Sequence, residues 1–407
     1  MPVSGSDKPV SRGAAAPWEW RLRVYPVAII VALAAAVVLA AAADTGTGGP
    51  DKRLGGDYPA FYAAGEIALD GDWDHLYDAR TQQSAQSGLV DDSEGFLYFA
   101  YPPPVAAVYA PLAGLTYRWS YLAHTLLMAL ALWGAIAMAR PMVPLVDRFP
   151  VAAFAGALLT YPLFRAVTGG QNTALTLLLI VAAARFEREG RLGAAGIAVG
   201  LMLYKPQFGV VFLALLIARR QWKSAASASV VGGVMWAVSA LLLGADWVSG
   251  WWSQAAEFAR LNADVNAPNL VSLPGALGHV FGTAGDVVGW LGAAVLVAGL
   301  LVIWWRLSDT DSRAIYALTA AVAVLVLPQP LFYEAGLVFF LGAVVVRNHA
   351  RAGLVLAGTA AATWVQPISG SLGSLPLTLV LAAFTVWAGS LLWIEFKHAE
   401  AERVPAF

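Results

Sequence analysis

Asp57 is the first residue whose type and surroundings could support catalysis. It follows Gly55 and Gly56, which allow backbone conformations that other residues rarely adopt. It precedes YPAFYAAGEIAL, in which apolar and polar residues recur at helical spacing. The pattern predicts an amphipathic helix in a membrane interface, where a carboxylate could take a proton from a hydroxyl group. An ordinary helix-capping Asp explains these residues equally well.

Lys205 is the second candidate, in the segment LMLYKPQFGVVF. Pro206 has no backbone N–H, so we expect the helix to break there and the lysine to face a cavity. A cation in that position could bind an anionic lipid phosphate. A lysine that extends to the lipid headgroups is the less favoured alternative, because few other lysines adjoin apolar segments on the same side of the membrane.

A double glycine in RAVTGGQNTAL has polar residues on both sides, between two apolar runs. Gln171 and Asn172 could hydrogen bond a sugar or a phosphate, or could cap the next helix. Arg165 is the cation nearest to them, but an arginine near a helix end can also extend into the headgroups.

Further polar candidates lie in two later segments. Tyr333 and Glu334 begin an apolar run in PQPLFYEAG, where the glutamate could cap a helix or act as an acid in a cavity. Asn269 and Ser272 lie in NADVNAPNLVSLPGALGHVF, although amides in loops are usually turn formers. The aromatic run FLYFAYPPP, at 96–104, is typical of an interfacial aromatic belt.

Metal and cofactor chemistry find no support in the sequence. The chain has no cysteine and five scattered histidines, and it lacks HExxH, Walker and GxSxG motifs. We therefore expect no metal site and no cofactor.

The composition is that of an integral membrane protein. Of 407 residues, 59% are hydrophobic and 13% charged, with a mean hydropathy of +0.66. The 25 basic and 26 acidic residues nearly balance, so no overall field indicates a nucleic-acid partner. The expected partner is the lipid bilayer.

Runs of apolar residues predict an all-α polytopic protein with about twelve transmembrane helices. The expected spans are 24–43, 119–139, 149–167, 171–186, 192–205, 207–219, 224–243, 285–306, 313–327, 331–346, 352–366 and 374–395. The segment 101–117 is broken by prolines and is expected not to span, or to lead into the next helix.

With twelve spans, the clusters of arginine and lysine between them fall on one side of the membrane together with both termini. Basic loops are typically cytoplasmic, so we expect both termini in the cytoplasm. We expect a single transmembrane domain, 24–396, between tails at 1–23 and 397–407. Its large extracytoplasmic loops are 44–103 and 244–284, and the first contains the amphipathic helices. The unusual polar groups therefore fall on the extracytoplasmic side.

The order of five segments resembles glycosyltransferase family 87, from about residue 24 to 346. They are GGDYPAFYAAGEIALDGDWDHLYD, FAYPPPVAAVYAPLAGL, TGGQNTALTLLL, GIAVGLMLYKPQFGVVFLALLIARR and NLVSLPGAL. The family has the GT-C fold and includes α-mannosyltransferases that use polyprenyl-phosphate-mannose. The resemblance implies an inverting transfer of a hexose, most often mannose, to a hydroxyl of a glycolipid or glycan on the outer face of the plasma membrane.

The same resemblance implies roles for individual residues. Asp57 matches the catalytic acid of the first outer loop, which would take the proton of the acceptor hydroxyl. Lys205 matches the lysine of the KPQ motif, which would stabilise the leaving lipid phosphate. Tyr333 stands where many members have a histidine. The expected donor pocket also contains Gln171, Asn172, Gln207 and Arg165, and the candidates for the acceptor or its loops are Asn269, Ser272, Glu334 and Tyr62.

Three alternatives stay open from the residues alone. A transporter or flippase of a lipid-linked sugar would place ionisable groups near mid-membrane on broken helices, whereas here they collect at one face, which favours an enzyme. A GT-C enzyme for another sugar or acceptor is equally compatible with the sequence. A polymer ligase is disfavoured, because 244–284 contains only one arginine and one histidine.

Overall fold

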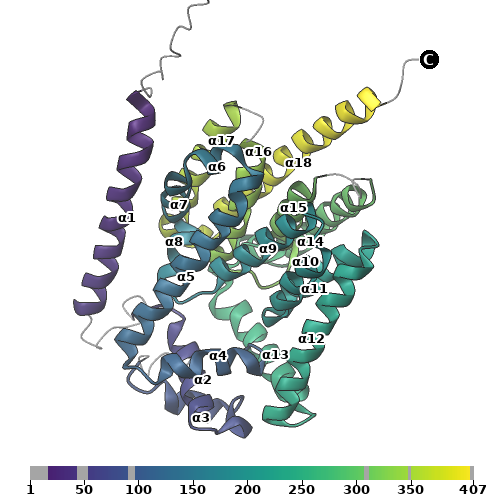
Figure 1. The fold of residues 1–407 in the computed structure, drawn as a ribbon. Helices are drawn as coiled ribbons and strands as arrows, with labels where there is room; N and C mark the ends of the chain where they lie inside the picture. The colour runs from purple at the N-terminus through teal and green to yellow at the C-terminus, as the bar shows by residue number, and fades with distance from the viewer. Residues whose placement is uncertain (1–16, 44–53, 90–96, 307–310, 347–349, 404–407) are drawn as a thin grey trace, which may run out of the picture.

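The computed structural model describes residues 17–43, 54–89, 97–306, 311–346 and 350–403, and these are helical with no β-strand (Figure 1). Residues 1–16 and 404–407 of the predicted tails and residues 44–53 and 90–96 of the first predicted loop lie outside the described residues. The α-helices are α1 (Pro17–Ala43), α2 (Tyr58–Leu69), α3 (Ala79–Ala85), α4 (Pro103–Ala113), α5 (Tyr117–Ala139), α6 (Pro144–Arg148), α7 (Pro150–Leu158), α8 (Tyr161–Thr168), α9 (Thr173–Arg188), α10 (Leu192–Leu201), α11 (Pro206–Ala218), α12 (Trp222–Leu243), α13 (Trp247–Val265), α14 (Leu273–Arg306), α15 (Ser312–Val326), α16 (Phe339–Val346), α17 (Ala350–Ala362) and α18 (Leu375–Arg403).

Several of these helices could cross a membrane, as the composition predicts. Five described helices, α1, α5, α12, α14 and α18, are long and apolar enough, and the bent pair α7 and α8 makes a sixth if it is one span. Helices occupy all twelve predicted segments, but the others are short, such as α11 with 13 residues. The protein is a multi-pass membrane protein of the all-α class.

Proline and 3₁₀ geometry account for the shortness. α7 and α8 are bent by 82° at residues 159 and 160, and Pro162 is the second residue of α8. The segment 331–346 begins with the 3₁₀ helix η6 (Phe332–Val338), and only its second half is the α-helix α16. α4 has 11 residues and is separated from α5 by a turn, so 101–117 is a short separate helix.

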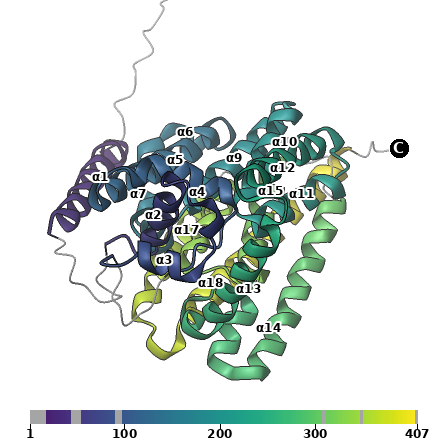
Figure 2. The same cartoon turned by 90° about the horizontal axis from the view of Figure 1, so that it is seen from below.

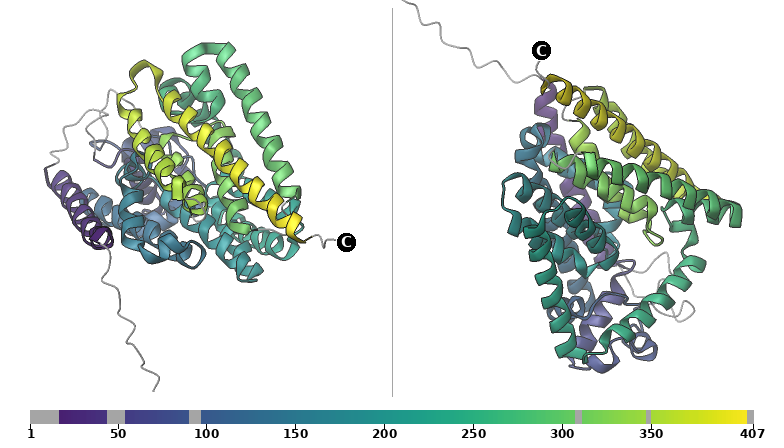
Figure 3. Two further views of the ribbon diagram at one scale, coloured as in Figure 1. Left: turned by 90° about the horizontal axis from the view of Figure 1, so that it is seen from above. Right: turned by 90° about the vertical axis from the view of Figure 1, so that its right-hand side faces the viewer.

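α14 reverses direction at Gly282, where the backbone has φ +60°. A Cβ atom at Gly289 would lie 2.4 Å from Cα of Pro274, so the two arms of the helix pack against each other. Figures 2 and 3 show this hairpin at the end of the long green helix. The longer arm, 283–306, coincides with the predicted span at 285–306, and the shorter arm belongs to the predicted loop.

The core lies around α9 and α15, which are buried on nearly all sides. α1 stands at the edge of the bundle beside α5 and α7, and Glu19 forms an ion pair with Arg148 of α6 (Figure 1). α2, α3, α4 and α13 gather at one end of the molecule. The polar candidates meet between this group and the N-terminal end of α9.

The helix predicted after Asp57 is present as α2, but it is not amphipathic in its packing. Ten of its 12 residues are buried, and it packs closely on α4, with Gly65 against the backbone of Tyr109. The prediction of an amphipathic helix is therefore wrong for α2, whereas its position in a membrane interface stays a prediction. Its few polar side chains are outnumbered by tyrosines and small residues that pack on every face.

Candidate active site

Two double glycines bring Asp57 beside the start of α9. Gly55, Gly56 and Gly170 all have positive φ, and the backbone N–H of Asp57 donates to the carbonyl of Gly169 at 3.1 Å. The two loops approach so closely that only glycine fits at 170. This contact holds Asp57 at the N-terminus of α2 next to Gln171.

Gly170→Ala is expected to lower both stability and activity far more than Gly190→Ala. Both glycines have φ above +70°, where an alanine costs about 1–2 kcal/mol. A Cβ at Gly170 would also lie 2.5 Å from the Gly55 carbonyl oxygen and the Tyr58 nitrogen, whereas nothing lies within 4 Å at Gly190. Thermal unfolding in detergent and a glycosyl-transfer assay of both variants test this, and equal effects would contradict the packing of the two loops.

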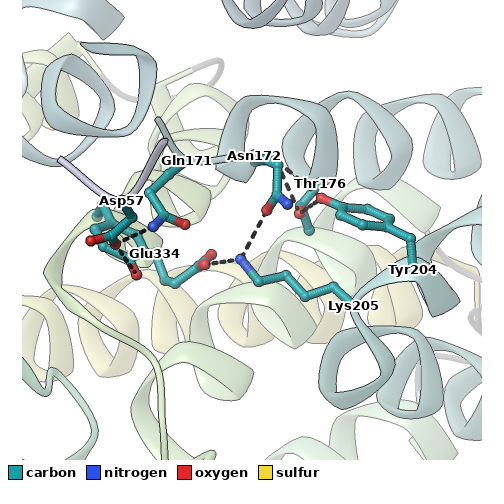
Figure 4. Close-up of polar contacts among 8 residues, drawn as sticks. Asp57, Gln171, Asn172, Thr176, Tyr204, Lys205 and Glu334 are labelled. Carbon is teal, nitrogen blue, oxygen red and sulfur yellow. Dashed lines mark hydrogen bonds and ion pairs between the residues drawn. The ribbon is translucent and has the colours of Figure 1, made fainter. Parts of the chain in front are cut away.

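The Asp57 carboxylate accepts hydrogen bonds from the side chains of Gln171 and Tyr333. Gln171 Nε2 donates to Oδ2, and the Tyr333 hydroxyl donates to the same oxygen at 3.4 Å (Figure 4). Asp57 is half-buried, whereas Gln171 is buried. The carboxylate is therefore oriented by neutral donors and keeps an accessible side, as a proton acceptor requires.

Lys205 lies at the break that Pro206 predicts, between the 3₁₀ turn at Met202–Tyr204 and α11. Its ammonium forms an ion pair with Glu334 and donates to Asn172 Oδ1 at 3.1 Å. Lys205 is 5% exposed and Glu334 2%. In Figure 4 the Glu334 carboxyl lies between Lys205 and the Asp57–Gln171 pair. Glu334 is thus the buried counter-ion of Lys205. Its ion pair with Lys205 is not a helix-capping contact.

Asn172 is fixed by two residues that the sequence did not single out. The Tyr204 hydroxyl donates to the Asn172 carbonyl oxygen at 3.0 Å and lies 2.6 Å from Thr176 Oγ1. The sequence offered little reason to select them, because Thr176 and Tyr204 lie inside apolar segments predicted to span the membrane. Together they hold the loop between α8 and α9 against the end of α10.

The segment with Tyr333 and Glu334 is positioned by the loop before α14. Leu331 and Leu270 form an isolated antiparallel bridge, and the N–H of Val271 donates to the carbonyl of Pro330 at 3.0 Å. η6 then packs against α8, α9 and α15. These contacts fix the segment that carries Tyr333 and Glu334 against the start of α9.

Tyr101 is a further residue of this cluster that the sequence reading missed. Its phenol lies close enough to Lys205 and Asn172 to interact electrostatically with both. Burial raises the pKa of Tyr101 above its ordinary value although the Lys205 ammonium opposes the shift, so the phenol is protonated at neutral pH. The run FLYFAYPPP contained this signal, but a belt of interfacial aromatics explained it equally well.

Side-chain hydrogen bonds tether the backbone around Tyr101. The Tyr77 hydroxyl donates to the Tyr101 carbonyl at 2.8 Å, and Trp251 Nε1 of α13 donates to the Ala100 carbonyl at 3.2 Å. Gln82 of α3 accepts from the N–H of Phe99 at 3.1 Å. The first predicted loop and α13 therefore fix the backbone at Tyr101, whose phenol lies near Lys205.

The other predicted residues lie apart from these contacts. Gln207 is exposed on α11, and the Tyr62 hydroxyl donates to the Leu115 carbonyl at 3.0 Å. Ser272 Oγ accepts from the N–H of Gly275 at 3.3 Å, as a helix cap does. Asn269 accepts from Gln366 at 3.5 Å, and Arg165 is half-buried on α8. Among the described residues, no group of three or more His, Asp or Glu side chains could hold a metal ion.

The cluster thus combines an oriented, accessible carboxylate with a buried cation and several neutral donors. A carboxylate can accept a proton from a hydroxyl, and a cation with neutral donors can bind an anion such as a phosphate. No curated protein and no solved structure matches the chain. The family model described as glycosyltransferase family 87 matches residues 99–328, more than half of the chain. It covers Tyr101, Gln171, Asn172 and Lys205, and with this match the protein belongs to glycosyltransferase family 87 as a membrane glycosyltransferase.

Proposed function

We propose that the protein transfers a hexose, most simply mannose, from a polyprenyl-phosphate donor to a hydroxyl of a glycolipid or glycan acceptor. The observation that carries the proposal is the half-buried Asp57 carboxylate next to the buried Lys205–Glu334 pair (Figure 4). A base and a cation so close together suit the two ends of one displacement: the attacking hydroxyl and the leaving phosphate.

In this mechanism Asp57 acts as general base. As the acceptor oxygen attacks the anomeric carbon, its proton passes to the Asp57 carboxylate and the bond between that carbon and the phosphate oxygen breaks. The bonding electrons leave with the polyprenyl phosphate, and the configuration at the anomeric carbon inverts. Gln171 and Tyr333 keep the carboxylate oriented through their hydrogen bonds to Oδ2.

Lys205 is assigned to the charge that develops on the leaving phosphate. Its ammonium donates to Asn172, pairs with Glu334 and lies within electrostatic range of the neutral Tyr101 phenol. The neutral groups can yield their places to phosphate oxygens, while Glu334 compensates the cation in apolar surroundings. The donor phosphate then lies on the far side of the sugar from Asp57.

The proposal includes the orientation of the chain and its fold. Alternating clusters of arginine and lysine support twelve spans of a GT-C fold in the plasma membrane, with both termini cytoplasmic and the site extracytoplasmic. A donor presented on a lipid carrier at that face explains why the acids of the first loop follow the first span.

A donor panel tests the proposal. Purified protein in detergent receives membrane lipid extract and one radiolabelled donor, with EDTA present: polyprenyl-phosphate-mannose, another polyprenyl-phosphate hexose, or nucleotide-linked mannose. We expect labelled glycolipid from polyprenyl-phosphate-mannose alone. Transfer only from the other polyprenyl-phosphate hexose would replace mannose as the proposed donor sugar. Transfer only from the nucleotide donor would overturn the proposed donor class. Absence of transfer from every donor would favour a transporter or flippase of the lipid-linked sugar.

A further inference from the structure

A rigid aromatic cluster adjoins the site but takes no part in the mechanism above. The rings of Tyr161 and Phe332 stack with centroids 5.3 Å apart and an interplanar angle of 21°. The ring centroids of Trp364 and Tyr161 are 5.3 Å apart, and Trp364 is 44% exposed. The three side chains come from α8, η6 and the 3₁₀ helix η7 (Thr363–Ile368), so segments far apart in the sequence build one surface.

This surface is continuous with the proposed base. Phe332 precedes Tyr333, and their ring centroids are 5.4 Å apart. The Tyr333 hydroxyl donates to the Asp57 carboxylate. A path of aromatic rings therefore leads from the exposed Trp364 to the group that would deprotonate the acceptor.

The cluster is held in place by polar contacts at its edges. Trp364 Nε1 donates to the Leu159 carbonyl at 2.7 Å, and the N–H of Tyr161 donates to Thr363 Oγ1 at 3.1 Å. Both contacts join η7 to the bend between α7 and α8. Rings fixed in this way lose little conformational entropy when a ligand binds on them.

Two hydrogen-bonded amides are linked to the short helix that carries Trp364. Gln366 is 7% exposed and lies two residues beyond Trp364, and its Nε2 donates to Oδ1 of the half-buried Asn269 at 3.5 Å. A pyranose presents C–H groups on its faces and hydroxyls at its edges, so fixed aromatic rings with an amide alongside match it. A lipid acyl chain would have no use for the amide.

We propose that Tyr161, Phe332 and Trp364 form the subsite for a sugar ring of the acceptor, with Asn269, the hydrogen-bond partner of Gln366, as the polar group for a sugar hydroxyl. The inference rests on the proposed function, since it supplies the hydroxyl that Asp57 deprotonates. The acceptor would then be a molecule that already carries a sugar, with its glycan along the aromatic rings and its reactive hydroxyl at Asp57.

Trp364→Ala tests this subsite, with Trp364→Phe as the conservative variant and Trp119→Ala as the matched control. Trp119 is 67% exposed on the first turn of α5, at the same predicted side of the membrane. The assay measures transfer from the active lipid-linked donor at graded concentrations of membrane lipid extract, and donor dependence at saturating extract. We expect the acceptor KM to rise about tenfold in Trp364→Ala and less in Trp364→Phe, with the donor KM unchanged and Trp119→Ala like the wild type.

The outcomes separate the subsite from the proposed function. An unchanged acceptor KM in an active Trp364→Ala, or an equal rise in Trp119→Ala, would make Trp364 a membrane-interface anchor and overturn the subsite alone. An equal rise in the donor KM would also overturn it. A wild-type protein that transfers no sugar from any lipid-linked donor would overturn the proposed function, and the subsite with it.

Discussion

Asp57→Asn is expected to lower kcat by about 10²–10⁴-fold with little change in the KM of donor or acceptor. The amide has nearly the size of the carboxylate, and its oxygen can still accept from Gln171 and Tyr333. It cannot take the proton of the attacking hydroxyl at neutral pH. Steady-state transfer kinetics of the purified variant measure the loss.

Asp70→Asn is the matched control for this substitution. Asp70 ends the same helix α2 that Asp57 begins, and it is exposed. We expect this variant to retain the wild-type kcat. An Asp57→Asn protein with full transfer activity would show that Asp57 does not act as the base.

Lys205→Met is expected to destabilise the protein by about 3–5 kcal/mol and to abolish transfer, because it leaves the Glu334 carboxylate buried without its counter-ion. The double variant Lys205→Met/Glu334→Met removes both charges and should regain most of the stability. It should not regain activity, since the cation for the leaving phosphate is still missing. Denaturant unfolding in detergent and transfer assays of the single and double variants separate the two effects.

Two results would contradict the roles of this pair. A double variant as unstable as Lys205→Met would show that the buried pair is not coupled as its contacts indicate. A stable double variant with wild-type activity would show that Lys205 does not act on the donor phosphate.

Local chemistry explains which parts of the site the sequence could predict. Asp57 follows two glycines and Lys205 precedes a proline, so each marks a break in an apolar pattern where a polar group has a reason to be present. Gln171 and Asn172 lie at a similar break. The structure brings these four together with Tyr333 and Glu334, and their chemical roles stay predictions.

The pairing of these residues was beyond the sequence. Lys205 and Glu334 are 129 residues apart, and Asp57 and Gln171 are 114 apart, so no helical or loop spacing relates them. Tyr101 looked like one aromatic among several in FLYFAYPPP until its proximity to Lys205 was visible. Gln207 shares the KPQ motif with Lys205 but is exposed on α11, whereas Lys205 precedes that helix with a non-helical backbone and is buried.

The predicted spans illustrate a second limit. Hydropathy locates apolar segments well, and each of the twelve contains a helix. It does not report where the helix bends, as α7 and α8 do by 82°, or where it becomes 3₁₀, as in η6. The burial of α2 was also not apparent, because small residues and tyrosines pack against protein as readily as against an interface.

The anomeric configuration of the product tests most directly whether Asp57 acts as a base in a single displacement. The donor should be a polyprenyl-phosphate sugar of one defined anomer, and the new linkage in the labelled glycolipid can be read by NMR coupling constants. A product of the opposite configuration is the expected result. A product with the donor's configuration would instead require two displacements, with a carboxylate such as Asp57 as nucleophile, and would contradict the role of Asp57 as base.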